Sequence, residues 1–215
     1  MMDKSFWWDK HDWSKHELLT SLFSHLKEIG SYNNDDYFST VELIGPGADP
    51  KKEIFMLLDC LPNSRKRGDK CMHFICYDPK TQDSEINTCY KNYNLKITCI
   101  KGRYEKARKA EEQPDISISI MLLPCLNYKE VSELSKIQYQ RARLAAIHVF
   151  ESEDVVTSVR YKGLKLHKRK ILIYTELFES KNWKVLYPLM IAPAHVNKER
   201  QNIDRQIMNL IYLAK

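Results

Sequence analysis

Strand-like and helix-like stretches follow one another in this chain without regular alternation, and this order constrains the fold more than any other feature. Residues 116–122 give the clearest strand, because isoleucines alternate with serines at the two-residue period of a half-buried strand. A helical pattern follows at 128–146, and residues 155–191 return to extended patterns. Because strict alternation of strands and helices is typical of parallel sheets, we expect an α+β fold, a single domain with a largely antiparallel sheet.

Three helices are expected to pack against this sheet, one N-terminal, one central and one C-terminal. The first helix is marked by a capping-box pair, Ser14 and Glu17, and is closed by Gly30. The central helix corresponds to residues 128–146. The last helix follows Pro193, with an apolar face that includes Ile203, Ile207, Leu210 and Ile211.

A polar stretch at residues 31–36 separates the first helix from the rest of the chain. It predicts two parts: residues 1–36, an N-terminal aromatic segment with the capped helix, and residues 37–215, the α+β domain. Residues rich in β-branched and aromatic side chains predict further strands at 37–44, 71–77, 93–100, 155–159, 164–178 and 183–191.

Glycine is scarce, and this scarcity argues against a bound nucleotide. The chain has six glycines and neither a G-x-G-x-x-G nor a G-x-x-x-x-G-K-[ST] pattern, so the usual nucleotide cradles are absent and no small-molecule cofactor is expected. Gly45-Pro46-Gly47 is interpreted as the stop of the preceding strand. Residues 51–60 are expected to form a helix, although their apolar centre suits a buried strand equally well.

Composition and cysteine usage indicate an intracellular protein, cytoplasmic or nuclear. No apolar run of membrane-spanning length and no signal peptide are present, so we expect neither secretion nor a transmembrane segment. The six cysteines are expected to be reduced, and those in strand-like runs to be buried. The one metal-like spacing, Cys71 to Cys76 with His73 between them, lies in an extended run and is not expected to form a metal site.

Positive side chains are clustered in three segments, and the chain carries a net charge of +6. Such clustering suits anionic phosphate groups, either of a lipid surface or of nucleic acid and nucleoprotein. Lysines on edge strands that prevent aggregation are the alternative interpretation. The predicted anion-binding residues are Arg65, Lys66, Arg67, Lys101, Arg103, Lys168, Arg169 and Lys170.

An aromatic group precedes the first helix: Phe6, Trp7 and Trp8. Next to Lys4 and Lys10, these side chains suit a membrane or protein interface. Packing onto the first helix as a hydrophobic staple is the alternative, and the sequence favours it.

A small metal-dependent nuclease is the enzymatic alternative. Glu176, Glu179 and Lys181 follow the acid-then-Glu-x-Lys pattern in which carboxylates hold Mg²⁺ and a lysine supports the attacking water. The pattern is common, and the seven histidines do not form a pair at metal-ligand spacing on one helical face. We therefore expect a protein without catalytic residues.

The order of elements from Tyr37 to Gln138 resembles that of rhabdovirus matrix proteins. The resemblance rests on the strand at residues 37–43, the basic turn and strand at 67–77, and the step from strand to helix between 116 and 138. It implies a non-enzymatic viral structural protein that self-associates and binds anionic membrane or nucleoprotein through its basic segments. A sequence-independent RNA-binding protein is the other non-enzymatic alternative.

Overall fold

The computed structural model describes residues 10–28, 38–60, 71–90, 93–151, 165–167, 169–191 and 208–215. The predicted interface residues Phe6, Trp7 and Trp8, and the predicted anion-binding residues Arg65, Lys66, Arg67 and Lys168, lie outside these ranges. The boundary predicted between residues 36 and 37 also lies outside them, so the division into two parts stays a prediction.

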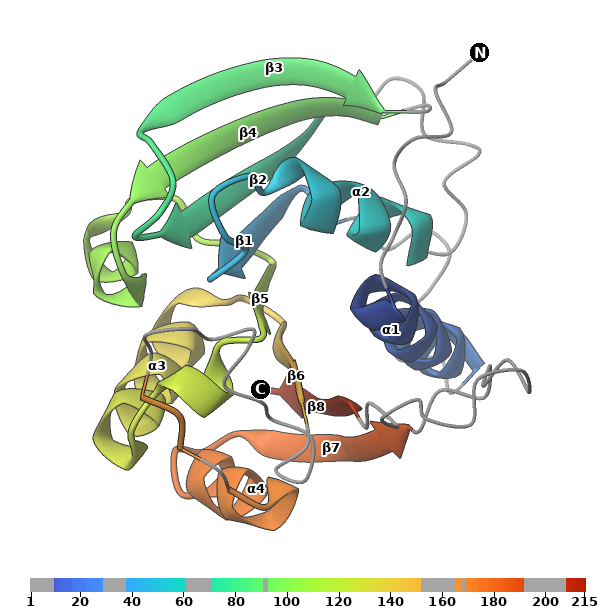
Figure 1. The fold of residues 1–215 in the computed structure, drawn as a ribbon, viewed down its shortest axis with the longest axis vertical. Helices are drawn as coiled ribbons and strands as arrows, with labels where there is room; N and C mark the ends of the chain where they lie inside the picture. The colour runs from blue at the N-terminus through green and yellow to red at the C-terminus, as the bar shows by residue number, and fades with distance from the viewer. Residues whose placement is uncertain are drawn as a thin grey trace.

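One mixed sheet forms the centre of the fold (Figure 1). Its strands run in the order β3-β4-β2-β1-β5-β6-β8-β7. Their bounds are β1 Thr40–Ile44, β2 Cys71–Asp78, β3 Ser84–Tyr90, β4 Tyr93–Lys101, β5 Ile116–Ile120, β6 Ala145–Glu151, β7 Lys184–Ile191 and β8 Met208–Ala214.

The central strands are parallel, so the predicted α+β fold with a largely antiparallel sheet is wrong. The pairs β1–β2, β1–β5, β2–β4 and β5–β6 are parallel, whereas β3–β4, β6–β8 and β7–β8 are antiparallel. All five residues of β1 and all five of β5 are buried. Burial on both faces is what a parallel strand covered by two helical layers experiences. The serines of β5 therefore do not mark an exposed face.

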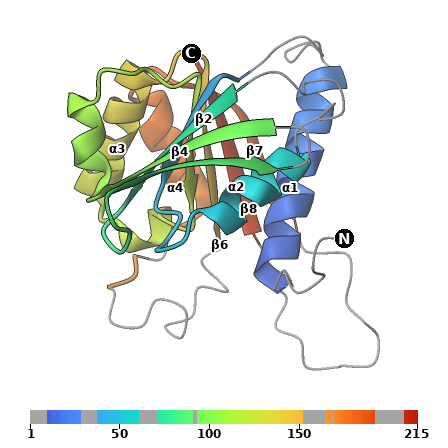
Figure 2. The ribbon, with the colours of Figure 1, turned by 90° about the horizontal axis from the view of Figure 1, so that it is seen from above.

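Helices cover both faces of the sheet (Figure 2). On one face, α1 (Lys10–Glu28) and α2 (Lys51–Cys60) share a core with apolar side chains of β1, β2 and β4. On the other face, α3 (Tyr128–Arg141), α4 (Ile171–Glu179) and the short 3₁₀ helices η2 (Tyr104–Lys109) and η3 (Leu123–Cys125) pack around a second core. Apolar burial on both sides explains why the sheet sits in the middle of three layers.

Several local predictions are confirmed. The helix at residues 51–60 is α2, and the strands at 71–78, 93–101 and 184–191 are β2, β4 and β7. The first helix is α1, although it begins at Lys10, before the predicted capping pair. Strand β7 carries Pro188 and lies at one edge of the sheet, as a proline in a strand requires.

Other local predictions are wrong. The end of the predicted strand at 164–178 is helix α4, whose buried side chains follow a helical spacing: Tyr174, Leu177 and Phe178. The described part of the expected C-terminal helix is strand β8, whose apolar side chains enter both cores, Leu210 on one face and Ile211 and Leu213 on the other. The central helix ends at Arg141, and residues 145 and 146 of its predicted range begin β6.

Strand β3 replaces a helix in the connection between β2 and β4. Parallel neighbours are usually joined by a helical crossover. Here the chain forms β3 at the edge of the sheet, beyond the position of β4, and β4 pairs antiparallel with it. Phe55 of α2 stacks on Tyr90 of β3, with ring centroids 4.1 Å apart, and covers this part of the sheet.

Candidate functional site

A pocket of about 610 Å³ lies where the strand order changes direction. The chain runs from β1 outward to β2 on one side, and β5 flanks β1 on the other side. The last residues of these three strands, Ile44, Asp78 and Ile120, all line the pocket. In open parallel sheets, ligands bind in the crevice at such a switch point, outside the carboxyl ends of the strands.

The turn after β1 borders the pocket with two glycines. Gly45 has a φ of +79° and Gly47 a φ of +91°, values that side chains rarely permit. The N–H of Gly45 donates to the carbonyl oxygen of Tyr77 at 2.9 Å and so joins the ends of β1 and β2. A Cβ on Gly47 would meet no atom within 4 Å, so this position leaves backbone open to the pocket.

Asp78, at the end of β2, holds this turn in place. One carboxylate oxygen of Asp78 accepts a hydrogen bond from the Gly47 N–H at 2.9 Å, and the other accepts one from the Lys80 N–H at 2.8 Å. Only 7% of Asp78 is exposed. Because a carboxylate has about four lone-pair sites, each oxygen keeps capacity for a further donor such as a hydroxyl group.

Two helices contribute an ion pair to the pocket wall. Lys15 of α1 and Glu53 of α2 are both buried, with 2.7 Å between Lys15 Nζ and Glu53 Oε1. Glu53 lies in the first turn of α2, directly after the glycine turn.

The opposite wall is mainly apolar and follows β5. Met121, Leu122 and Leu126 line it, together with the thiol-bearing Cys125. Met121 has a φ of +56°, which is uncommon for a residue other than glycine.

A buried polar cluster supports the sheet beneath the pocket. Glu42 of β1 is fully buried, accepts a hydrogen bond from Ser117 at 2.9 Å, and pairs with Arg141 of α3 at 3.2 Å. Burial raises the pKa of Glu42 above its usual range, and the charge of Arg141 opposes that rise. Arg141 also donates to the carbonyl oxygens of Ala110 and Glu112, which ties the approach to β5 onto α3.

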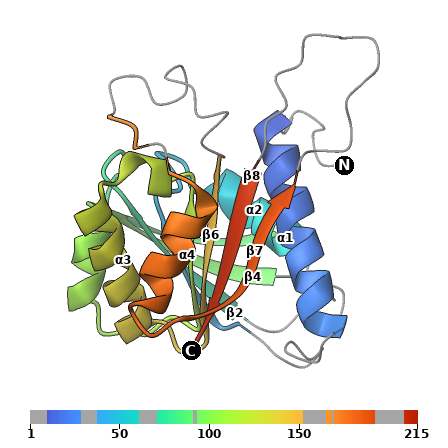
Figure 3. The ribbon, with the colours of Figure 1, turned by 90° about the horizontal axis from the view of Figure 1, so that it is seen from below.

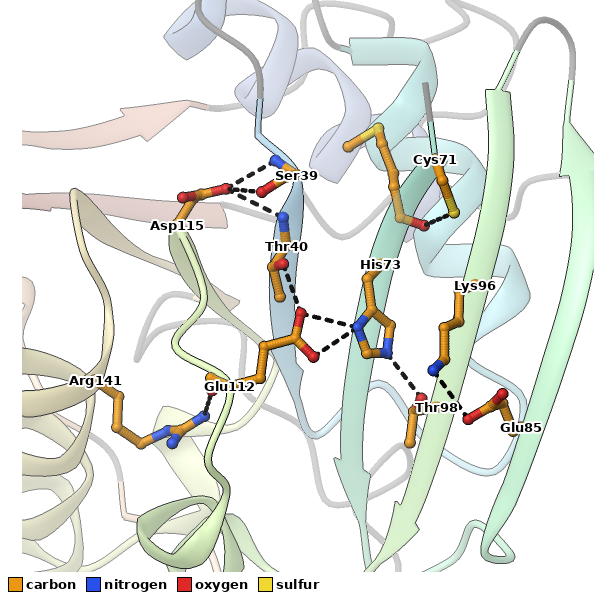
Figure 4. Close-up of polar contacts among 11 residues, drawn as sticks. Ser39, Thr40, Cys71, His73, Glu85, Lys96, Thr98, Glu112, Asp115 and Arg141 are labelled. Atoms are coloured by element: carbon orange, nitrogen blue, oxygen red, sulfur yellow. Dashed lines mark hydrogen bonds and ion pairs between the residues drawn. The ribbon is translucent and has the colours of Figure 1, made fainter. Parts of the chain in front are cut away.

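A second network lies at the other ends of these strands (Figure 4). The Glu112 carboxylate accepts a hydrogen bond from Thr40 at 2.8 Å and contacts His73 Nδ1, while His73 Nε2 contacts Thr98. Asp115 accepts hydrogen bonds from the backbone N–H groups of residues 39 and 40. Because Thr40 and Asp115 mark the amino ends of β1 and β5, this network is structural and remote from the pocket.

The structure brings part of the predicted anion-binding set to the pocket end of the sheet. Lys101 ends β4, and Arg103 lines the pocket, where it pairs with Glu130. Arg169 donates to the carbonyl oxygen of Leu126, and Lys170 is the residue before α4. Figure 3 shows α4 beside α3 on one face of the sheet. Their role in binding an anion stays a prediction.

The proposed nuclease residues do not form a site. Glu176 and Glu179 are exposed on α4, and Lys181 lies in the turn that follows it. The predicted metal pattern required carboxylates at strand ends, whereas these lie on a helix. No group of three metal-ligating side chains occurs within the described part of the chain. In the same part, no helix is long and apolar enough to span a membrane.

Sequence reasoning missed the pocket residues because their signal is weak. Gly45-Pro46-Gly47 contains only the first two glycines of the dinucleotide fingerprint, so the sequence alone indicates no more than the end of a strand. Asp78 lies 31 residues after Gly47, whereas the acidic residue of that fingerprint follows after about 20. The sequence offers four signals of this pocket in order: an apolar strand, a Gly-x-Gly turn, a helix, and a second apolar strand that ends in Asp.

Many solved structures are similar to this one, although their sequences are not. No protein-family model matches the chain, and no curated protein is significantly similar to it in sequence. Cyclopropane synthase MmaA2 from Mycobacterium tuberculosis has a TM-score of 0.60 at 9% identity, over 99% of this chain and 87% of that one. Magnesium protoporphyrin IX methyltransferase from Synechocystis PCC 6803, with bound SAH (S-adenosylhomocysteine), has a TM-score of 0.58 at 10% identity, over 94% and 83%. N-methyltransferase NodS from Bradyrhizobium japonicum WM9 has a TM-score of 0.55 at 10% identity, over 96% and 98%.

The chain is therefore an α/β protein with a Rossmann-like fold and a pocket at the carboxyl edge of its sheet. The fold is that of the class I methyltransferases, with a mixed, mostly parallel sheet. At these identities the likeness establishes the fold.

This finding overturns the resemblance to rhabdovirus matrix proteins, which rested on a similar order of elements. The expected non-enzymatic structural protein, its RNA-binding alternative and its partners in anionic membrane or nucleoprotein are corrected with it, because the matching structures are two methyltransferases and a cyclopropane synthase. The nuclease alternative is corrected as well, because none of these matches is a nuclease and its residues do not form a site in the described part of the chain. The prediction that no small molecule is bound as a partner is also contradicted, since SAH and SAM (S-adenosylmethionine) occupy matching structures.

Proposed function

We propose that this chain is a SAM-dependent methyltransferase. The observation that carries the proposal is the hydrogen bond between Asp78 and the Gly47 N–H, which joins the ends of β1 and β2 at the rim of the pocket. The fold likeness supports it, because two of the matching methyltransferase structures contain SAH or SAM.

The residues present suit this cofactor. The adenosine part carries two vicinal hydroxyl groups, and Asp78 has the spare acceptor capacity to bind them. Gly47 leaves room for close approach of a ligand to the backbone, since a Cβ there would enter open space. The volume of about 610 Å³ falls in the range of pockets that hold small molecules of this size.

When bound, SAM would supply an electrophilic methyl group on its sulfonium, and transfer of that methyl group to an acceptor would break the S–CH₃ bond and leave SAH. The chain contributes positioning. Asp78 would fix the ribose end, and the turn from Gly45 to Gly47 would fix the adjoining chain of the cofactor. Met121, Leu122 and Leu126 provide an apolar wall that excludes water from the reacting groups, and such exclusion suppresses side reactions.

Isothermal titration with SAH tests the proposal, because SAH binding does not require the acceptor to be known. We expect the wild-type protein to bind SAH and Asp78→Ala to bind it at least about 10-fold more weakly, since hydrogen bonds to charged groups contribute about 1.5–3 kcal/mol. Asp83→Ala is the matched control: Asp83 is exposed and accepts a hydrogen bond from the Lys101 N–H outside the pocket. Melting curves establish that each variant is folded. A wild-type protein that binds no SAH at about 1 mM overturns the proposal.

A further inference from the structure

One oxygen of the Glu53 carboxylate lacks a partner. Oε1 of Glu53 accepts from Lys15, but Oε2 has no hydrogen bond to any described residue and is shielded from water. Only 9% of Glu53 is exposed. A buried carboxylate oxygen without a donor is unfavourable, and a buried ion pair is by itself weak evidence of a contribution to stability.

In the other carboxylates of the pocket wall, each oxygen already accepts a hydrogen bond from the protein. Both oxygens of Asp78 accept backbone N–H groups. Glu130 accepts from Arg103 through Oε1 and from the Asn127 N–H through Oε2. Among the described residues that line the pocket, Glu53 is therefore the carboxylate with an unused oxygen.

We propose that Glu53 binds the α-ammonium group at the amino-acid end of the cofactor, an inference that rests on the proposed function. An ammonium group supplies both a positive charge and N–H donors, which is the chemistry that satisfies a carboxylate oxygen in a poorly solvated site. The last torsion of a glutamate side chain is soft, so the carboxylate can turn Oε2 toward the pocket. Lys15 is a positioning residue, because its Nζ lies 2.7 Å from Oε1 and so fixes one oxygen of the Glu53 carboxylate.

The position of Glu53 agrees with this role. It lies in the first turn of α2, which begins four residues after Gly47 at Lys51, whereas Asp78 ends β2. Glu53 and Asp78 thus contribute two separate acidic groups to one pocket, one suited to an ammonium group and one to hydroxyl groups.

A comparison of two ligands on each variant tests the assignment. The probes are SAH and its deamino analogue, in which hydrogen replaces the α-ammonium group, and binding is measured by isothermal titration. We expect the wild-type protein to prefer SAH about 10- to 100-fold, as a charge-assisted hydrogen bond implies. In Glu53→Gln this preference should fall to about 2-fold or less, because the neutral amide no longer attracts the ammonium charge.

Glu130→Gln is the matched control, since Glu130 lines the same pocket but has both oxygens occupied, and it should keep the wild-type preference. If Glu53→Gln does not fold, Lys15→Met/Glu53→Gln removes both charges together and should show the same loss of preference. A wild-type protein that binds both ligands equally, or a folded Glu53 variant that keeps the preference, overturns the assignment. Failure of the wild type to bind either ligand overturns the proposed function instead.

Discussion

Replacing Arg141 by methionine should destabilise the protein, because Glu42 would stay buried without its opposite charge. Glu42 is fully buried and lies 3.2 Å from Arg141 Nε. The same guanidinium donates to the backbone at Ala110 and Glu112, at 2.7 and 2.8 Å. Removing one partner of a buried ion pair costs about 3–5 kcal/mol. In a chain of this length, that cost corresponds to a melting temperature lower by about 6–20 °C.

The loss should depend on pH in a defined direction. Burial raises the pKa of Glu42 in the folded protein, and removal of Arg141 raises it further. The folded variant therefore binds the Glu42 proton more tightly than the unfolded chain does, so its stability is greatest at low pH and is lost as pH rises through the folded pKa. Each additional unit of pKa adds about 1.4 kcal/mol to the destabilisation at high pH.

Urea unfolding at about pH 5 and about pH 8 measures this effect. We expect the difference in unfolding free energy between wild type and Arg141→Met to be larger at the higher pH. Arg143→Met is the control, because Arg143 is exposed and its partner Asp115, although buried, keeps its hydrogen bonds from Ser39 and Thr40. We expect this variant to lose less stability than Arg141→Met. Glu42→Gln/Arg141→Met should recover stability at the higher pH. An equal loss at both pH values would refute the buried-charge explanation.

Two further predictions concern the sheet and the pocket. His148 is fully buried, lies 2.6 Å from Ser119 Oγ, and burial lowers its pKa to about 3. Because the unfolded chain takes up this proton near pH 6.5, the free energy of unfolding should fall by about 1.4 kcal/mol per pH unit below that value. His148→Phe should remove this part of the pH dependence. An imidazole of the folded protein that titrates above about pH 5 by NMR contradicts the prediction. Gly47→Val should weaken SAH binding about 10-fold or more in isothermal titration, because a β-branched residue is strained at a φ of +91° and its side chain enters the pocket. Unchanged affinity in a folded variant would show that Gly47 does not approach the ligand.

Helices and strands were predictable from the sequence where capping residues or the spacing of apolar side chains determine them. Asp49 and Pro50 mark the start of α2, and alternating apolar side chains mark β4. The direction of the strands was not predictable in the same way, because it depends on long-range pairing. The alternation of Ser117 and Ser119 with isoleucines predicts a solvent-exposed face, yet each serine is buried with a polar partner from another element.

The same limitation applies to the pocket. Gly47 and Asp78 are 31 residues apart, and only the parallel pairing of β1 with β2 brings them together. Glu53 has one carboxylate oxygen paired with Lys15 of a different helix, and its other oxygen has no hydrogen bond to a described residue. No spacing rule connects these positions, so their chemistry becomes visible only when the sheet is assembled.

The hairpin of β3 and β4 has a consequence for how local opening of the sheet affects the pocket. Strand β3 lies at the edge of the sheet and pairs with β4, and none of its side chains is buried. Segments with few buried apolar contacts open at the lowest free-energy cost. Separation of β3 from β4 would leave β4 paired with β2, and β2 with β1, so Asp78 would keep its place. The pocket would therefore keep its wall while the outer edge of the sheet exchanges its amide protons.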